Sequence, residues 1–318
     1  MFNLFKLAGN TFKESVREPI YGVLLLLSVL LIGHYPAASL FVFSEQIKLV
    51  VDSSMATTLT FGLFISIFAA SHTVSREMRN GTVLLLMSKP VARWTFVMAK
   101  ILGIAAASLV FVFITSIASI IAIYVAADQF HQNYTAYYLY LLAIAGACVA
   151  GGLMNFFKGT SFTSAITLVL SILMPVFALI CIVTQSEPTI SIANYSNALV
   201  LLFFAVAAMS TITVVFATRL NLVSNLCVCT LIFFLGLVSG YLFNRETGSS
   251  MLDLIYGVLY AILPNWQFFW VADALSVNRA IPFPYVLQAG LYVILYMILA
   301  SMWAVAFFLN REIAKDSR

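Results

Sequence analysis

Residues 101–126 read ILGIAAASLVFVFITSIASIIAIYVA, a run without a single charged side chain. A helix that crosses a bilayer needs about 20 consecutive, mostly apolar residues, and this run exceeds that length. The rest of the chain is similar, since 63% of its 318 residues are hydrophobic and only 9% are charged. A soluble domain carries about 25% charged residues. The sequence therefore predicts an integral membrane protein.

Other apolar runs along the chain are also long enough to span a bilayer. Together with residues 101–126 they give eight predicted spans: Ile20–Phe43, Met55–Val74, Ile101–Ala126, Tyr137–Phe157, Phe162–Thr184, Ala198–Thr218, Leu222–Phe243 and Tyr285–Leu309. None of these runs contains Asp, Glu, Lys or Arg. Two pairs are separated only by 158–161 and 219–221, so a six-span arrangement stays open. The predicted fold class is all-α, a polytopic transmembrane helix bundle.

The basic residues are distributed unevenly around these spans. With the N-terminus placed in the cytoplasm, every one of the 16 Lys and Arg residues except Lys48, Arg245 and Arg279 falls on the cytoplasmic side. Cytoplasmic loops of membrane proteins carry such an excess of Lys and Arg. We therefore expect a multi-pass protein of the cell (inner or plasma) membrane with both termini in the cytoplasm.

Residues 1–19 are too polar to span the membrane and are predicted to form an amphipathic interfacial helix. One face carries Leu4, Leu7, Ala8, Phe12, Ser15 and Val16, and the other carries Asn3, Lys6, Asn10, Lys13, Glu14 and Arg17. A signal peptide that is cleaved near 37–39 is the competing interpretation. It is disfavoured because Glu14 and Glu18 would lie in its basic n-region.

The remaining chain is expected to form a single transmembrane domain, 20–309, followed by a cytoplasmic tail, 310–318. Segment 251–284 is apolar and aromatic but is interrupted by charges and prolines. If it crossed the membrane, the basic tail would be forced outside. We therefore expect an extracytoplasmic re-entrant or interfacial segment, with Trp266, Phe268, Phe269 and Trp270 at headgroup depth.

The sequence contains none of the usual catalytic motifs that we sought. It has no phosphate-binding GxxxxGK[ST] loop, no HExxH metal motif and no nucleophile elbow. Its four cysteines lie in apolar runs without polar flanks that would hold a metal. His34 lies near the outer end of the first predicted span, and no predicted span holds a carboxylate. These features argue against an enzyme and against an ion-driven carrier, and they suggest that energy enters from a partner.

The densest polar pattern lies in the predicted cytoplasmic loop 75–100, which reads SREMRNGTVLLLMSKPVARWTFVMAK. Gly81 permits a sharp turn, Thr82 can cap a helix, and Pro90 ends one. The pattern predicts a short helix parallel to the membrane. An ordinary basic loop whose arginines reach lipid phosphates explains the charges equally well.

This loop also resembles the permease subunits of type-two ABC exporters. The shared pattern is E-x-x-x-G-T, then L-L-x-S-K-P-V-x-R, and a Lys before the next span. It is carried by Glu77, Gly81, Thr82, Leu85, Leu86, Ser88, Lys89, Pro90, Val91, Arg93 and Lys100. The resemblance extends to residues 10–17, 217–220, 234–241 and 263–267.

The resemblance implies a mechanism. Two permease chains would pair as a homo- or heterodimer, and each would dock a cytoplasmic ATPase that binds ATP and Mg, so this chain would need no cofactor. The loop would be the coupling helix, and its ATPase-coupling interface would comprise Glu77, Gly81, Thr82, Ser88, Lys89, Pro90 and Arg93. An autonomous ion-independent carrier or channel, or a membrane anchor of an assembly complex, is the alternative.

Overall fold

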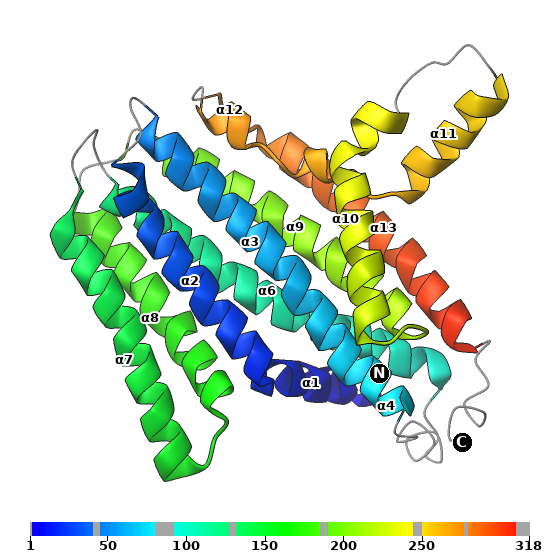
Figure 1. The fold of residues 1–318 in the computed structure, drawn as a ribbon, viewed down its shortest axis with the longest axis horizontal. Helices are drawn as coiled ribbons and strands as arrows, with labels where there is room; N and C mark the ends of the chain where they lie inside the picture. Colours follow the sequence, from blue (N-terminus) through cyan, green and yellow to red (C-terminus); the bar gives the residue numbers. More distant parts are fainter. Residues whose placement is uncertain are drawn as a thin grey trace.

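A computed structural model describes residues 2–40, 45–79, 92–126, 132–184, 188, 190–243, 250–276 and 279–309. Within these ranges the chain forms helices and no strand, so the predicted all-α polytopic bundle is confirmed (Figure 1). Eight described helices are long and apolar enough to cross a membrane.

The longer helices are α1 (Phe2–Arg17), α2 (Pro19–Ser39), α3 (Gln46–Ala70), α6 (Arg93–Val125), α7 (Tyr134–Lys158), α8 (Phe162–Thr184), α9 (Ile192–Ala217), α10 (Leu222–Phe243), α11 (Ser250–Ile262) and α13 (Phe283–Leu309). Shorter elements are a π-helical turn, Ser71–Ser75, α4 (Arg76–Arg79), a 3-10 turn, Trp266–Phe268, and α12 (Ala272–Ser276).

Two helices extend well beyond the apolar runs that predicted them. Helix α3 begins at Gln46 rather than Met55, so it includes Lys48 and Asp52, which precede the predicted uncharged run. Helix α6 begins at Arg93 rather than Ile101. The apolar run marks only the part of a helix that lipid can surround. The helix itself continues for as long as its backbone groups find partners along the axis.

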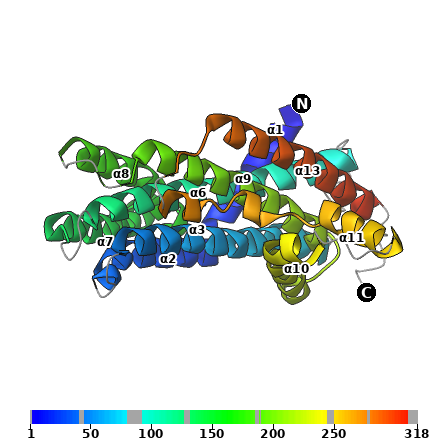
Figure 2. The same cartoon turned by 90° about the horizontal axis from the view of Figure 1, so that it is seen from above.

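Helices α3, α6 and α9 form the centre of the bundle. Most of the residues in their apolar windows are buried, 67% in α3 and α6 and 78% in α9, against 22% in α7, α10 and α13. Figure 2 shows the other helices arranged around this centre. In a bilayer the exposed Leu, Ile and Phe side chains of the outer helices face lipid, so their exposure costs little.

One end of the bundle gathers several chain segments that are far apart in sequence. Helix α1, helix α4 and the last turn of α13 lie at this end, together with the turns between α7 and α8 and between α9 and α10 (Figure 1). We call it the α1 end. The sequence predicts all of these segments on the cytoplasmic side.

Segment 251–284, predicted as re-entrant or interfacial, contains a bent helix pair. Met251–Ile262 and Trp266–Leu275 meet at 53°. The bend packs on the middle of α10, where a Cβ added to Gly236 would meet Trp266, and one added to Gly240 would lie 3.0 Å from Gln267. The Gln267 side chain also donates to the Leu237 carbonyl at 3.0 Å. The two glycines therefore serve packing within one chain.

Two of the aromatic side chains at this bend are buried within the protein. Trp266 and Phe269 are each only 1% exposed. They pack against Phe233 of α10 and Tyr292 of α13. These two rings are covered by α10 and α13, which approach from far along the sequence, and the depth of the segment in a membrane stays a prediction.

Candidate coupling interface

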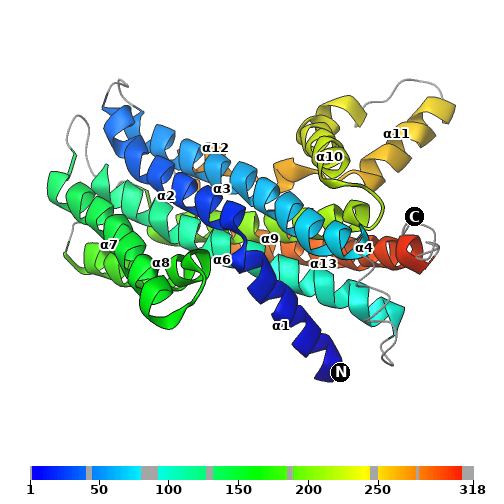
Figure 3. The same ribbon diagram turned by 60° about the horizontal axis from the view of Figure 1, so that its bottom comes forward.

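Helix α1 docks on the first half of α6 through one face. Ala8, Thr11, Ser15 and Val16 are buried, whereas Lys6, Lys13 and Arg17 are exposed. The close approach depends on Gly103 of α6, where an added Cβ would lie 2.6 Å from both the Ala8 carbonyl oxygen and Thr11 Cβ. Figure 3 shows α1 leaving the bundle at an angle to the spans.

Thr11 is the one buried α1 residue that the amphipathic pattern missed. Its hydroxyl donates to the Leu7 carbonyl at 3.1 Å, four residues earlier in the same helix. The polar group is thereby satisfied within α1, so its burial needs no partner from α6. Thr11, which the predicted pattern assigned to neither face, therefore belongs to the buried face.

A single extended residue separates α1 from α2. Glu18 has φ −64° and ψ 132°, and Pro19 follows it at the first turn of α2. The ring of a proline disfavours helical geometry in the preceding residue, which explains the break. The junction is held to α8 by the Thr163 hydroxyl, which donates to the Arg17 carbonyl at 2.9 Å. Helix α1 can therefore lie across the spans.

The electrostatic centre of the site is a cluster that we call the Lys100 cluster, formed by Glu14, Glu77 and Lys100. The Lys100 Nζ atom lies 2.8 Å from Glu77 Oε1 and 3.6 Å from Glu14 Oε2. It also lies 5.7 Å from the centre of the Phe96 ring, within the range of a cation–π contact. The Lys100 side chain is only 7% exposed. The cluster connects three elements, because Glu14 is on α1, Glu77 on α4 and Lys100 on α6.

Burial also controls the ionisation of Glu77. Loss of solvent raises the pKa of its carboxyl above the ordinary value, and the nearby Lys100 ammonium opposes that shift. The negative charge of Glu14 raises the pKa further. The ionised form of Glu77 therefore depends on Lys100.

A second polar chain runs from α1 to α4 through His72 in the π-helical turn. Glu18 Oε1 lies 2.7 Å from His72 Nδ1, and Arg76 Nη1 lies 3.3 Å from His72 Nε2. A guanidinium can only donate, so His72 Nε2 accepts from Arg76. A groove of about 480 Å³ opens beside this chain, lined by Asn10, Lys13, Glu14, Arg17, Glu18 and Arg76.

The π-helical turn is itself fastened to the turn between α9 and α10. The Ser75 hydroxyl lies 2.9 Å from the Ala217 carbonyl oxygen and 2.8 Å from that of Leu220. Asn225, which is fully buried in α10, donates to the Ser71 hydroxyl at 2.9 Å. Wide π-helical turns of this kind often lie at functional sites. The segment that bears Glu77 is thus linked to α1, α6, α9 and α10.

We expect Asn225→Leu to destabilise the protein by about 1–2 kcal/mol, in the range measured for buried polar contacts within membranes. The leucine would leave the Ser71 hydroxyl and the Thr213 carbonyl, 3.3 Å from the Asn225 amide, without this donor. Unfolding in SDS titrations of the solubilised protein measures the change. Cys227→Ala, at an exposed position of the same helix, is the control. A stability equal to that of the control would contradict this assignment to Asn225.

The structure places only part of the predicted interface. Glu77 lies in the Lys100 cluster, and Arg93 lies exposed in the first turn of α6. Gly81, Thr82, Ser88, Lys89 and Pro90 fall outside the described residues, as does the predicted helix in this loop. Glu14, Glu18 and His72 were not predicted as site residues. No local spacing connects them to Glu77, because the contacts arise only when α1 docks on α6.

These features describe a membrane-embedded helix bundle with a charged cluster at one end. The described residues contain no group of three or more His, Cys, Asp or Glu side chains that could hold a metal. A family profile described as ABC-2 family transporter protein matches residues 5–247. The chain therefore belongs to this family and is a permease subunit of the type-two ABC class. No curated protein matches the chain.

Proposed function

We propose that this chain is the permease of an ATP-driven exporter in the cell (inner or plasma) membrane, powered by a separate cytoplasmic ABC ATPase. The observation that carries the proposal is the Lys100 cluster, which joins α1, α4 and α6 at the α1 end. A displacement of residues 76–93 would be transmitted to α1 through Glu14 and to α6 through Lys100. The ionic contacts would thereby convert movement of one loop into movement of spanning helices.

The ATPase is proposed to dock on the α1 end, which then faces the cytoplasm together with both termini. Its contact would include Glu77 and Arg93 and, between them, Gly81, Thr82, Ser88, Lys89 and Pro90. The charged groove beside Arg76 supports this placement, because polar and charged surfaces of this kind provide specificity at interfaces. ATP and Mg would bind to the partner.

A second permease chain, identical or related, would complete the transporter. Helix α10 supports pairing, because its outer face carries large exposed side chains, including Leu231, Phe234 and Tyr241. Closure of the ATPases would move the α1 ends. This movement would change the side of the membrane to which the pathway between the two chains is open.

The test is co-purification of the permease with the candidate ATPase after charge reversal at exposed positions. Arg76→Glu and Arg93→Glu are each expected to lower the affinity for the ATPase about tenfold, or about 1.4 kcal/mol, and to reduce stimulation of ATP hydrolysis. Arg279→Glu makes the same charge change at an exposed residue just after α12, which lies at the end opposite α1 (Figure 1), and should have no effect. If all three variants bind and stimulate the ATPase like the wild type, the proposed docking surface is wrong.

A further inference from the structure

A second groove lies between α1, α6 and α8, with a volume of about 430 Å³. We call it the α1–α8 groove. Its apolar walls come from all three helices: Phe12 and Val16 of α1, Val110 of α6, and Leu168 and Ile172 of α8. Lys13 and Arg17 of α1 line the same groove. The same two cations also line the charged groove beside Arg76, but the apolar walls belong to the α1–α8 groove alone, and ATPase docking does not account for them.

The hydroxyls of α8 do not make this wall strongly polar. Thr167 donates to the Thr163 carbonyl at 2.8 Å, and Ser171 donates to the Thr167 carbonyl at 2.7 Å. Each hydroxyl proton is thus used within its own helix. The wall formed by α8 therefore presents mainly carbon to whatever fills the groove.

The two cations are held beside the groove with free donor capacity. Lys13 and Arg17 are one helical turn apart, so their side chains lie on the same face of α1. Both are exposed, and among the described residues neither forms an ion pair, since Glu14 and Glu18 contact Lys100 and His72 instead. An anion at this position would meet two cations that lack a carboxylate partner.

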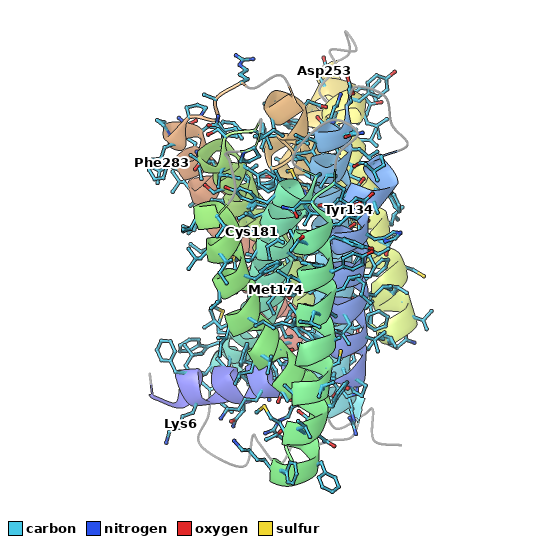
Figure 4. All side chains as sticks on the ribbon, turned by 90° about the vertical axis from the view of Figure 1, so that its left-hand side faces the viewer. Lys6, Tyr134, Met174, Cys181, Asp253 and Phe283 are labelled. Carbon is cyan, nitrogen blue, oxygen red and sulfur yellow. The ribbon has the colours of Figure 1, made fainter. Side chains whose placement is uncertain are left out.

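The position of the groove matches one leaflet of a membrane. Figure 4 shows α1, marked by Lys6, lying across the bundle near the end opposite Tyr134, Asp253 and Phe283. The α8 wall runs from Ser164 to Ile172, a rise of about 12 Å. The hydrocarbon of one leaflet is about 15 Å thick. A lipid of this leaflet would therefore have its headgroup beside the two cations and its acyl chain along the apolar part of the groove.

We infer that the α1–α8 groove binds an anionic phospholipid of the leaflet on the α1 side. Its phosphate would contact Lys13 and Arg17, and one acyl chain would lie along Val110, Leu168 and Ile172. Basic pockets between spanning helices on the cytoplasmic side recognise anionic headgroups in this way. The bound lipid would fasten α1 to α8, so lipid composition would influence how firmly the coupling end is held.

Native mass spectrometry of the purified permease, without an ATPase, tests the headgroup contact. The probes are dioleoyl phosphatidylglycerol, which is anionic, and dioleoyl phosphatidylcholine, which has the same chains and no net charge. We expect tighter binding of phosphatidylglycerol. The double variant Lys13→Gln/Arg17→Gln should lose about 30-fold in affinity for it, and Lys158→Gln, which removes an exposed charge outside the groove, should not.

The acyl-chain contact needs a separate variant. Ser171→Trp fills the groove and should reduce binding of both lipids, whereas Ile180→Trp, at an exposed position of α8 outside the groove, should leave binding unchanged. Equal affinity for the two lipids in the wild type would overturn the inference. So would full phosphatidylglycerol binding by the double glutamine variant or by Ser171→Trp. These measurements use the permease alone, so their outcome is independent of whether an ATPase docks at Arg76 and Arg93.

Discussion

Replacing Lys100 with methionine is expected to destabilise the protein by about 3–5 kcal/mol, the usual cost of removing one partner from a buried ion pair. Methionine fills similar space but leaves Glu77 and Glu14 without their shared cation. The Glu77 side chain, only 21% exposed, would then hold a charge with little water to solvate it. SDS unfolding of the solubilised protein measures the loss.

The Lys100→Met variant should also acquire a distinctive pH dependence. Burial already raises the pKa of Glu77 above its ordinary value of 4.5, and without Lys100 the pKa rises further. In the pH interval between the unfolded and folded pKa values, the folded state binds more protons than the unfolded state. Stability therefore falls as pH rises through that interval. The variant should be closer to the wild type near about pH 5 than near about pH 8.

Two control variants separate this effect from a general loss of charge. Lys158→Met removes an exposed cation and should leave stability nearly unchanged. Lys100→Met/Glu77→Gln removes the buried pair together and should recover most of the stability, because no buried carboxylate is then left unpaired. A double variant no more stable than Lys100→Met would show that Lys100 acts through its packing and not through Glu77.

Substitution of Gly103 is expected to displace α1. An alanine Cβ at this position would lie 2.6 Å from the Ala8 carbonyl oxygen, whereas ordinary contacts begin near 3.4 Å. The obstacle is helix backbone, which cannot rotate aside as a side chain can. We expect Gly103→Ala to cost about 1–3 kcal/mol, the range found for overpacked cores, and Gly103→Val to cost more. Moving α1 would also lengthen the contact between Glu14 and Lys100.

Gly152→Ala provides a matched control within the same protein. Gly152 is also helical, and a Cβ added there has no other atom within 4 Å. Its replacement should be neutral or slightly stabilising, because alanine favours a helix over glycine. SDS unfolding and stimulation of the partner ATPase are measured for both variants. If Gly103→Ala behaves like Gly152→Ala in both assays, α1 is not held tightly against α6.

Much of the fold could be predicted from the sequence. A long apolar run in a membrane forms a helix whatever its neighbours, because its backbone groups must be satisfied within the segment. Helices α8 and α10 coincide with the predicted runs, Phe162–Thr184 and Leu222–Phe243. Helix α3 began earlier than predicted because its first turns are polar. A hydrophobic run identifies the part in lipid, but capping side chains, prolines and backbone partners decide where the helix ends.

The candidate site was less accessible to sequence reasoning. Glu77 was found because it belongs to a dense local motif. Lys100 was placed at the edge of a cytoplasmic loop, but it lies inside α6 and is almost completely buried. Its partners are contributed by α1 and α4, and no spacing along the chain predicts which acid reaches it.

The amino-acid sequence by itself determined that this protein is a bundle of membrane-spanning helices with an amphipathic helix at its start. The hydrophobicity of a segment and the helical spacing of its apolar residues depend only on residues that are close in sequence. Both can therefore be read from the sequence itself. The tertiary structure alone decided that α1 meets α6 at Gly103, and that Lys100 lies between Glu14 and Glu77. Such contacts depend on how the helices pack, because ion pairing and close approach join residues that are distant in sequence.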